Sequence, residues 1–494
     1  MAKKKQKTHT NLQNPLESML ERFLPYLNES EKHALHTELE QPLHPALRIN
    51  PLKVNRIEKI HEWAERYHWQ IKQIPFCDDG FWITDSPTPI SKTIEHQTGH
   101  YYIQDAASML PVEMFDFDNN EYPLILDMAA SPGGKTTHLV SKTNDKALLL
   151  ANDSSRERLT ALRIVLQNWG ASHVGITNYP GDYFGNWFPE TFDRVLLDAP
   201  CSMQGLRESD SHSIKPITQK EINQLAKRQI KLLESAIKSV KIGGQVVYST
   251  CTLTIEENEM VLDVILNSFP DKIHIDPLQP MLQERSPAFQ HAQEFVLHPQ
   301  VKNAARIWPF SFGTAGFFAA RITKINSIDT VYKPPPSRSL STVNWFPISD
   351  KSLTDLDHVL FSTYGFSLQQ LIIENNWEIW QFKNSYHVFP VAFLDQFATF
   401  PVQSLGLPLG EMVDSDLQLS HEFVSRFGSI IQGNTYTVEN DQLDEWMQGN
   451  DLAISSDKEI GILIIKDHLG RTLGRGKLTN SRLRNMMPRR ALLQ

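Results

Sequence analysis

Short apolar runs alternate with amphipathic stretches along the middle of the chain, from Tyr122 to Lys324. Several runs are apolar at every position, which is typical of strands buried on both faces, and their alternation with helices indicates a parallel sheet covered on both sides. The expected strands are PLILDMAA, ALLLAND, HVGIT, RVLLDAP, QVVYSTC and the closing FFAARITK; the expected helices are TTHLVSK, SRERLTALRIVLQNWG and KEINQLAKRQIKLLESAIKSV. The pattern predicts an α/β fold with a mainly parallel, doubly wound sheet.

The segments on either side have other patterns. Residues 15–40 carry apolar residues at helical spacing, which predicts one or two amphipathic helices. A proline-rich linker, IDTVYKPPPSRSLSTVN, follows the α/β domain. The predicted division is a disordered basic tail (1–12), N-terminal helices with a small α/β subdomain (13–115), the doubly wound domain (116–325), the linker (326–344), a small α+β domain (345–405) and a last domain (406–494).

Composition narrows the class of protein. Lys and Arg number 48 and Asp and Glu 57, and the resulting net charge of −9 disfavours, as an average, a nucleic-acid partner. No apolar run approaches the roughly 18 residues that span a bilayer, so no membrane-spanning segment is expected. The three cysteines, Cys77, Cys201 and Cys251, are too few for a disulfide framework and include no CxxC pair. The basic start lacks the apolar stretch of a secretory signal, so we expect a cytoplasmic protein.

The loop in LDMAASPGGKTTHL lies between an expected strand and an expected helix, where doubly wound folds bind nucleotide-like ligands. A phosphate-binding P-loop would need Gly where Ala129 stands, and a GxGxxG motif is absent. Asp153 ends the next strand about 20 residues later, where a carboxylate can accept hydrogen bonds from a ribose. Taken alone, the glycine loop is equally compatible with an ordinary turn, and Asp153 with a solvated acid. Together they indicate an adenosine-containing ligand without a polyphosphate.

Two cysteines follow two of the expected strands. Asp198 and Cys201 lie in RVLLDAPC, and Cys251 ends QVVYSTC. Because the carboxyl ends of parallel strands face the ligand, both thiols are expected beside the glycine loop. A single cysteine is more often a small buried hydrophobe, and Cys77, in a polar loop far from the sheet, keeps that interpretation. A pair at matching strand ends, one beside Asp-Ala-Pro, favours chemistry.

A thiolate near a carboxylate and an adenosine ligand suits methylation at carbon 5 of cytosine. That carbon is a poor nucleophile until a group adds to carbon 6, and a deprotonated cysteine can make the addition. A carboxyl group at the N3 edge would stabilise the charge that arrives on the ring. The activated ring would take a methyl group from S-adenosylmethionine, and loss of the carbon 5 proton would expel the cysteine.

The motifs DMAASPGGKT, DAPC and YSTCTLTIEENE resemble those of the Sun/nucleolar-protein family of RNA cytosine-5 methyltransferases. LRIN, YYIQDAASMLP and RIWPFSFGTAGFFAA resemble further motifs of that family, so the similarity extends from about Leu47 to Lys324. It implies a Rossmann-like, S-adenosylmethionine-dependent fold, Cys251 as the nucleophile, Cys201 as the residue that assists product release and Asp198 as the carboxyl at the base edge. The implied methyl-donor site consists of Ala129, Ala130, Ser131, Pro132, Gly133, Gly134, Lys135, Asp153, Asp182 and Asp198.

Two positions depart from the family. The family has an aspartate near the adenine where NYPGDYFG has Pro180, so Asp182, two residues later, is carried over in its place. The closing motif often ends in histidine, and Phe310 stands here, so no imidazole role is assigned.

The end of the chain resembles the bacterial branch of the family that modifies ribosomal RNA of the small subunit, through LGLPLGEMV and GRGKLTNSRLRNMMPRRAL. That resemblance implies a PUA-like RNA-binding domain over 406–494 and a cytosine near the decoding region of 16S rRNA as the target. Residues 466–494 hold eight Lys or Arg against one acid, which favours phosphate contact. Acids cluster elsewhere, as in Glu439–Glu445, so binding is expected to depend on local basic patches.

Two alternatives stay open. A tRNA-directed relative would carry the same core motifs, and a non-catalytic RNA-binding assembly factor would keep the fold, although it has no need for two thiols and a carboxyl at one sheet edge. We expect RNA as the partner, a monomer, and neither a membrane nor a metal. His96 and His100 are four residues apart, but Gly99 between them disfavours a metal site. Trp63, Tyr67 and Trp69 are expected in a core.

Overall fold

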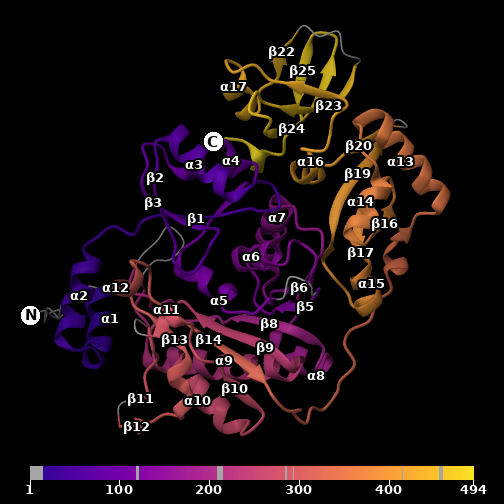
Figure 1. The fold of residues 1–494 in the computed structure, drawn as a ribbon. Coiled ribbons are helices and arrows are strands. Elements are labelled where there is room, and N and C mark those ends of the chain that lie inside the picture. Colours follow the sequence, from indigo (N-terminus) through magenta and orange to yellow (C-terminus); the bar gives the residue numbers. More distant parts are fainter. Residues whose placement is uncertain are drawn as a thin grey trace, which may run out of the picture.

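The computed structural model describes residues 15–117, 122–207, 215–283, 286–292, 294–413, 416–454 and 460–493. A central nine-stranded sheet lies between an N-terminal region and two C-terminal sheets (Figure 1). The basic tail predicted over 1–12 falls outside the described residues. Among the helices in these ranges, none has the length and apolar character needed to cross a bilayer.

Five parallel strands form the middle of the central sheet, in the order β7-β6-β5-β8-β9. The chain lays down β5, β6 and β7 outward in one direction and then returns to add β8 and β9 on the other side of β5. This reversal creates a switch point between β5 and β8, where ligands bind at the carboxyl ends of the strands. The parallel strands are β5 (Leu124–Asp127), β6 (Leu148–Asn152), β7 (Val174–Thr177), β8 (Phe192–Asp198) and β9 (Val240–Thr250). The antiparallel strands at the edges are β10 (Ile273–Ile275), β13 (Ala305–Ile307), β14 (Phe317–Lys324) and β18 (Ser404–Leu405).

Helices cover both faces of this sheet. Leu124 and Leu126 belong to the core under one set of helices, whereas Ile125 between them belongs to the core under the other set. The first set is α8 (Phe184–Trp187), α9 (Gln219–Ser239) and α10 (Glu259–Ser268), and the second is α6 (Gly134–Lys142) and α7 (Leu159–Trp169). The predicted doubly wound α/β architecture is confirmed.

The N-terminal region consists of helices and a small antiparallel sheet of order β2-β3-β1-β4. Trp63 and Trp69, only 2% and 4% exposed, lie in its core with Tyr67 packed against them, as expected. Cys77 is also buried, in the core that contains Ile125 of the central sheet. Its placement in a loop far from the sheet is therefore wrong, because the preceding apolar residues carry this turn into the core. The elements are α1 (Pro15–Phe23), α2 (Glu29–Leu39), β1 (Ala46–Ile49), α3 (Arg56–Tyr67), β2 (Gln70–Gln73), β3 (Gly80–Asp85), α4 (Ile94–Gln97), β4 (Tyr101–Ile103) and α5 (Leu110–Glu113).

Two further sheets follow the linker. The first has the order β15-β16-β17-β19-β20, and the second the order β21-β23-β24-β25-β22. The first sheet contains β15 (Phe346–Pro347), β16 (Trp377–Phe382), β17 (Ser385–Pro390), β19 (Leu407–Val413) and β20 (Asp416–Leu419), with α13 (Asp350–Tyr364), α14 (Leu368–Asn375), α15 (Val391–Phe397) and α16 (His421–Phe427). The second contains β21 (Thr435–Thr437), β22 (Leu452–Ala453), β23 (Gly461–Lys466), β24 (Thr472–Thr479) and β25 (Arg482–Asn485), with α17 (Leu443–Met447).

The domain boundary predicted between residues 405 and 406 falls inside the first of these sheets. β17 pairs with β19 across it, and Gly406, with φ +61°, only turns the chain between β18 and β19. β18 itself pairs with β7 of the central sheet, and Phe393 and Phe397 of α15 lie in the core of the doubly wound domain. The region after the linker is thus joined to the doubly wound domain by a strand and by core packing.

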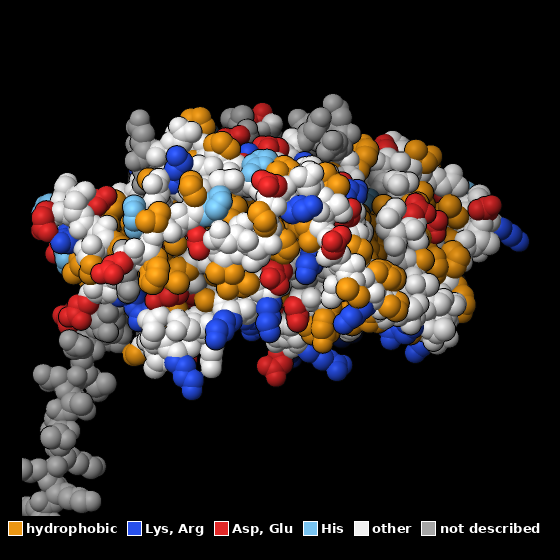
Figure 2. Space-filling model, turned by 90° about the horizontal axis from the view of Figure 1, so that it is seen from below, with side chains coloured by type: hydrophobic (Ala, Val, Ile, Leu, Met, Phe, Trp, Pro, Cys, Tyr) orange, Lys and Arg blue, Asp and Glu red, His pale blue; other side chains and the backbone are white. Residues whose placement is uncertain are grey.

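The C-terminal sheets also contact the N-terminal region, over α3 and α4 in Figure 1. Arg471 Nη1 lies 2.7 Å from Oε1 of the buried Glu95, and Lys53 Nζ donates to Ser425 Oγ at 2.7 Å. From below, Figure 2 shows basic and acidic side chains mixed over that face, with several Lys and Arg along one margin.

Candidate active site

The glycine loop lies at the switch point, between the end of β5 and the start of α6. Gly133 precedes α6 with φ +117°, a left-handed conformation that glycine adopts without strain. A Cβ on Gly134 would lie 2.9 Å from Cε1 of Tyr102, so the ring leaves no room for a side chain there. Ala129, Gly134 and Lys135 are partly exposed, whereas Ala130, Ser131 and Gly133 are buried. The first turn of α6 therefore presents backbone N–H groups beside an accessible stretch of loop.

A buried arginine from the N-terminal sheet fixes the start of α6. Arg48, in β1, donates to the carbonyl of Gly134 at 3.0 Å, to Thr137 Oγ1 at 2.7 Å and to Gln104 Oε1 at 3.0 Å. Its guanidinium lies 4.7 Å from the centre of the Trp169 ring. None of the hydrogen-bond acceptors is a carboxylate, and burial lowers the pKa of Arg48 to about 10. Its place in the fold makes it a positioning residue for the loop.

A second buried charge lies under the loop. Asp127 ends β5 and accepts a hydrogen bond from Thr136 Oγ1 at 2.7 Å. Burial raises the pKa of Asp127 to about 7, so a neutral carboxyl group is populated at physiological pH.

The other carboxylates of the expected methyl-donor site lie at neighbouring strand ends. Asp153, just after β6, is 2% exposed and accepts hydrogen bonds from the backbone N–H groups of Ser131 at 3.2 Å and Ser155 at 2.8 Å. Arg158 Nη1 lies 3.3 Å from it. Asp153 thus ties the loop to the next strand. Asp182, in the turn after β7, is exposed.

The two cysteines meet at the ends of β8 and β9. The Ala199 N–H donates to the Ser249 carbonyl at 2.8 Å, and this bond extends the ladder between the strands to their carboxyl ends. Cys201 Sγ and Cys251 Sγ lie 3.0 Å apart; both thiols are partly exposed, and they are not joined in a disulfide. The structure therefore brings together the two sulfurs that the sequence places at matching strand ends.

Lys135 and Asp198 form an ion pair at the same edge. Lys135 Nζ lies 2.7 Å from Asp198 Oδ2, and Ser249 Oγ donates to Asp198 Oδ1 at 2.8 Å. Burial opposes the charge on Lys135, but Asp198 and the sulfur of Cys251 outweigh it and raise the lysine pKa. A permanent cation from the glycine loop thus lies close enough to Cys251 to favour its thiolate.

Glu257, fully buried, holds the loop that carries Cys201. Its carboxylate accepts hydrogen bonds from the Ser202 N–H and from Gln229 Nε2, at 2.9 Å each, from Thr254 Oγ1 at 2.7 Å and from the Ser202 hydroxyl. Hydrogen bonding to Cys251, burial and the charges of Cys251 and Glu257 raise the pKa of Cys201. Cys201 is therefore held as a thiol beside Cys251.

The next two residues secure the segment after Cys251. Asn258 accepts from Thr250 Oγ1 at 2.6 Å and donates to the Thr252 carbonyl at 2.9 Å. Glu259 forms a fully buried ion pair with Arg306, whose guanidinium also donates to the Leu253 carbonyl at 2.7 Å. The acidic run EENE therefore has a separate anchoring role at each of its last three positions. In the sequence, this run is recognised as a motif without these roles, and Arg48 in LRIN and Arg306 in RIWPFSFGTAGFFAA likewise lie within motifs, with no role assigned to either arginine.

One group of residues outside this site has metal-binding atoms. Cys77, Glu113 and His138 place one donor atom each within 4.8 Å of one another. Lys142 Nζ already lies 2.7 Å and His138 Nε2 3.0 Å from the Glu113 carboxylate. His138 Nδ1 is buried and has no hydrogen-bond partner in the described part of the chain, whereas a metal-bound histidine usually donates from its second nitrogen. The group is explained as an ion-paired cluster in the core.

Several known proteins are similar to this chain in sequence and in fold. Residues 112–323 match the family described as 16S rRNA methyltransferase RsmB/F, and residues 17–106 match the N-terminal domain of 16S rRNA methyltransferase RsmF. The ribosomal RNA small subunit methyltransferase F of Aeromonas salmonicida (strain A449) is 33% identical over 91% of each chain, and that of Erwinia tasmaniensis is 30% identical over 95% of this chain and 94% of its own. A methyltransferase homologue from Pyrococcus horikoshii has a solved structure that is 31% identical, with a TM-score of 0.53 over 62% of this chain and 99% of its own.

The fold, the loop at the switch point and these similarities define a Rossmann-like, S-adenosylmethionine-dependent methyltransferase. The residues fit that methyl donor, because the first turn of α6 offers N–H groups to its carboxylate beside the accessible Ala129, Gly134 and Lys135. At this level of identity and coverage, the chain belongs to the 16S rRNA methyltransferase RsmB/F family.

Proposed function

We propose that this protein methylates carbon 5 of a cytosine in 16S ribosomal RNA, near the decoding region, through a covalent bond between Cys251 and carbon 6. The observation that carries the proposal is the pair of cysteine sulfurs 3.0 Å apart, next to the Lys135–Asp198 ion pair. The choice of RNA rests on the relatives, which are named for the small ribosomal subunit.

Cys251 begins the reaction as the nucleophile. Its thiolate, favoured by Lys135, adds to carbon 6, and the ring electrons move toward N3 and carbon 5. Asp198 and Lys135, joined at 2.7 Å, offer a hydrogen-bonded proton to the N3 edge, where negative charge arrives. Residues 129–135, with Asp153, Asp182 and Asp198 nearby, would hold S-adenosylmethionine, which would supply the methyl group to carbon 5 and leave as S-adenosylhomocysteine.

Cys201 completes the reaction. While Cys251 is a free thiolate, its hydrogen bond and its charge hold the pKa of Cys201 high. Formation of the sulfur–carbon bond removes both effects, so Cys201 can then release its proton to solvent water and, as a thiolate, accept the proton from carbon 5. The electron pair of that C–H bond restores the double bond between carbons 5 and 6, and Cys251 leaves as a thiolate.

Three cysteine variants test these roles. Cys251→Ala is expected to abolish methyl transfer and leave RNA binding intact, and retained turnover would remove the nucleophile assignment. Cys201→Ala is expected to trap the covalent protein–RNA adduct as a slower band on a denaturing gel, and absence of the band would contradict the release role. Cys77→Ala, a cysteine outside the site, is the matched control and should turn over normally.

The C-terminal sheet supplies a surface for RNA phosphates. Lys477 of β24 and Arg484 of β25 are exposed and lie directly opposite each other across the strands. Like charges in such a pair are unfavourable, which supports a role with an anion. Glutamine at both positions should weaken RNA binding. It should also reduce the steepness of the plot of log binding constant against log salt concentration by about 1.4 to 1.8. The control is glutamine at Lys227 and Arg228, exposed on α9. Deleting the whole region after the linker is unsuitable, because Phe393, Phe397 and Leu405 belong to the catalytic core.

The identity of the RNA is tested separately. Bisulfite sequencing of ribosomal RNA and tRNA from a strain lacking this protein should show one or more cytosines of 16S rRNA that are no longer protected from deamination by bisulfite. Loss confined to tRNA would support the tRNA-directed alternative, and loss nowhere would support a non-catalytic assembly factor.

A further inference from the structure

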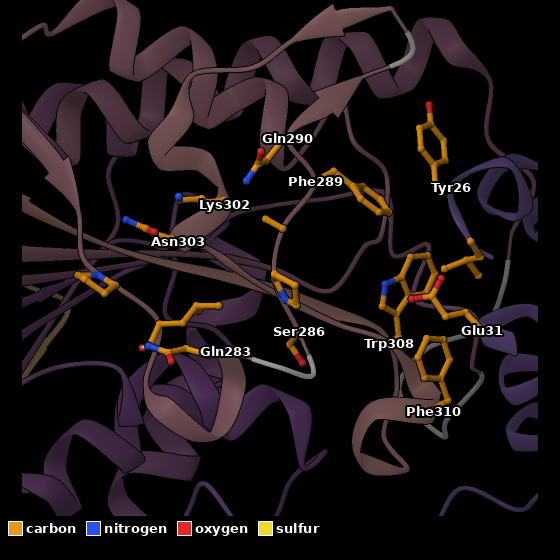
Figure 3. A pocket seen from close by; sticks show the side chains of 15 residues that line it. Tyr26, Glu31, Gln283, Ser286, Phe289, Gln290, Lys302, Asn303, Trp308 and Phe310 are labelled. Atoms are coloured by element: carbon orange, nitrogen blue, oxygen red, sulfur yellow. The ribbon is translucent and has the colours of Figure 1, made fainter.

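A cavity of about 610 Å³ opens between the N-terminal helices and the segment from Pro277 to Phe310 (Figure 3). Four aromatic side chains, Tyr26, Phe289, Trp308 and Phe310, gather on one side of it, and Gln283, Lys302 and Asn303 lie on the opposite side. None of the residues that line it belongs to the glycine loop or to the ends of β5, β6 and β7. The cavity is therefore separate from the expected methyl-donor site.

The aromatic rings leave usable faces and edges. Trp308 and Phe310 are stacked, with centroids 6.1 Å apart and an interplanar angle of 8°, and Tyr26 lies 5.2 Å from Phe289. Tyr26, Phe289 and Phe310 are each half-buried, and all three line the cavity. A cavity whose lining combines aromatic rings with amide and charged groups suits a flat heterocycle that carries hydrogen-bonding edges.

The wall of this cavity is built into the catalytic centre. The Arg306 guanidinium lies 4.6 Å from the Phe289 centroid and 5.6 Å from the Trp308 centroid, and the same group pairs with Glu259 and donates to the Leu253 carbonyl at 2.7 Å. Trp308 packs with Leu253 and Leu206 in one buried cluster. Leu253 is two residues after Cys251, so their Cα atoms are at most about 7.6 Å apart.

We propose that this cavity receives an unpaired nucleobase of the RNA substrate, next to the target cytosine. The inference rests on the proposed function, because Cys251 can reach carbon 6 only when the target base has left the stack, and its neighbour then loses a stacking partner. Aromatic side chains replace such lost stacking in the recognition of single-stranded RNA. The amides of Gln283, Gln290 and Asn303 meet the edges of the base, and the exposed Lys302 meets a phosphate.

The test uses short RNAs that the wild-type enzyme methylates, with 2-aminopurine placed in turn at each position flanking the target. Phe289→Leu and Gln290→Ala alter the cavity, and Phe361→Leu, 64% exposed on α13, is the matched control. Wild-type protein and the control should quench the fluorescence at one flanking position, and the cavity variants should lose the quenching. Phe289→Leu should raise the Kd for RNA about tenfold, equivalent to about 1.4 kcal/mol, and leave the Kd for S-adenosylmethionine unchanged.

Three results would overturn the inference. The first is equal 2-aminopurine fluorescence with Phe289→Leu and with Phe361→Leu. The second is a Kd for S-adenosylmethionine that rises together with the Kd for RNA. The third is a 4-thiouridine at the flanking positions that crosslinks outside residues 26–31 and 277–310. Gln290→Ala changes an exposed side chain, so it keeps the test valid if Phe289→Leu folds poorly. Failure of the proposed function is seen separately, as RNAs that the wild-type enzyme does not methylate.

Discussion

Replacing Glu257 with alanine is expected to slow release of the methylated RNA far more than replacing it with glutamine. The carboxylate accepts four hydrogen bonds, two of them from Ser202, the residue that follows Cys201. Glu257 thus holds the loop that presents Cys201 to the base. Cys251 directly follows β9, and the last residues of that strand, Ser249 and Thr250, are held by the ladders with β8 and β14. The damage is therefore expected in release and not in adduct formation.

The hydrogen-bond donors around Glu257 determine the free-energy cost of replacing it. The Ser202 N–H and the Gln229 NH₂ group can only donate, whereas the hydroxyls of Ser202 and Thr254 can rotate toward other partners. A buried donor without an acceptor costs about 1–3 kcal/mol, so alanine costs about 2–6 kcal/mol. Glutamine keeps an oxygen for the two obligate donors and offers its NH₂ to the hydroxyl oxygens, and it removes a buried charge. Even about 2 kcal/mol at the loop corresponds to release about thirtyfold slower.

Single-turnover methylation followed on denaturing gels measures this effect. Glu257→Ala should accumulate the Cys251–RNA adduct and release it slowly, and Glu257→Gln should stay close to wild type. The control is Glu256→Gln, because the neighbouring carboxylate accepts from Gln219 at 2.7 Å and not from the Cys201 loop. Equal release rates for the alanine variant and the wild type would refute the positioning role.

Three further outcomes follow from buried charges. Arg306→Met is expected to lower the free energy of unfolding of the catalytic domain by about 3–5 kcal/mol, because Glu259 stays buried and charged. The double variant that also carries Glu259→Leu should recover most of this lost free energy. Urea unfolding followed by tryptophan fluorescence measures both. Burial raises the pKa of Asp127 from 3.8 to about 7, so wild-type stability should fall, by on the order of 4 kcal/mol, as pH rises through this range and then level off; thermal melts should show Asp127→Asn without that fall. Arg48→Met should weaken S-adenosylmethionine binding about tenfold in calorimetry, about 1.4 kcal/mol, by freeing the start of α6.

The central fold could be predicted because its signals are local. Each strand of the parallel sheet is a short apolar run, and each helix shows its own period, so their order along the chain already defines a doubly wound sheet. The same reasoning brings Cys201, Cys251 and Asp198 together, because the carboxyl ends of parallel strands share one edge. The ion pair between Lys135 and Asp198 was within reach of that reasoning, since both residues were expected at the edge.

The supporting residues could not be predicted because their partners are distant in the sequence. Arg48 reaches Thr137 across 89 residues, Glu257 reaches Ser202 across 55 and Arg306 reaches Glu259 across 47. In the sequence, such a charged residue cannot be distinguished from a charged residue on the surface, because its burial depends on partners that are distant in the chain. The boundary at 405/406 failed for a related reason, since Gly and Pro mark a turn without showing that the strands on either side of it pair.

The surroundings of the two thiols explain why they take opposite roles, although they lie 3.0 Å apart. Two adjacent thiolates would repel each other, so one sulfur has to keep its proton. The hydrogen bond to Cys251 and burial, with the charges of Cys251 and Glu257 added, raise the pKa of Cys201, whereas Lys135 supplies the positive charge that Cys251 needs as an anion. In the proposed mechanism the proton therefore stays on Cys201, and nucleophilic attack falls to Cys251. Once Cys251 is bonded to carbon, the reason for keeping Cys201 protonated disappears, and the same sulfur becomes the base that the last step requires.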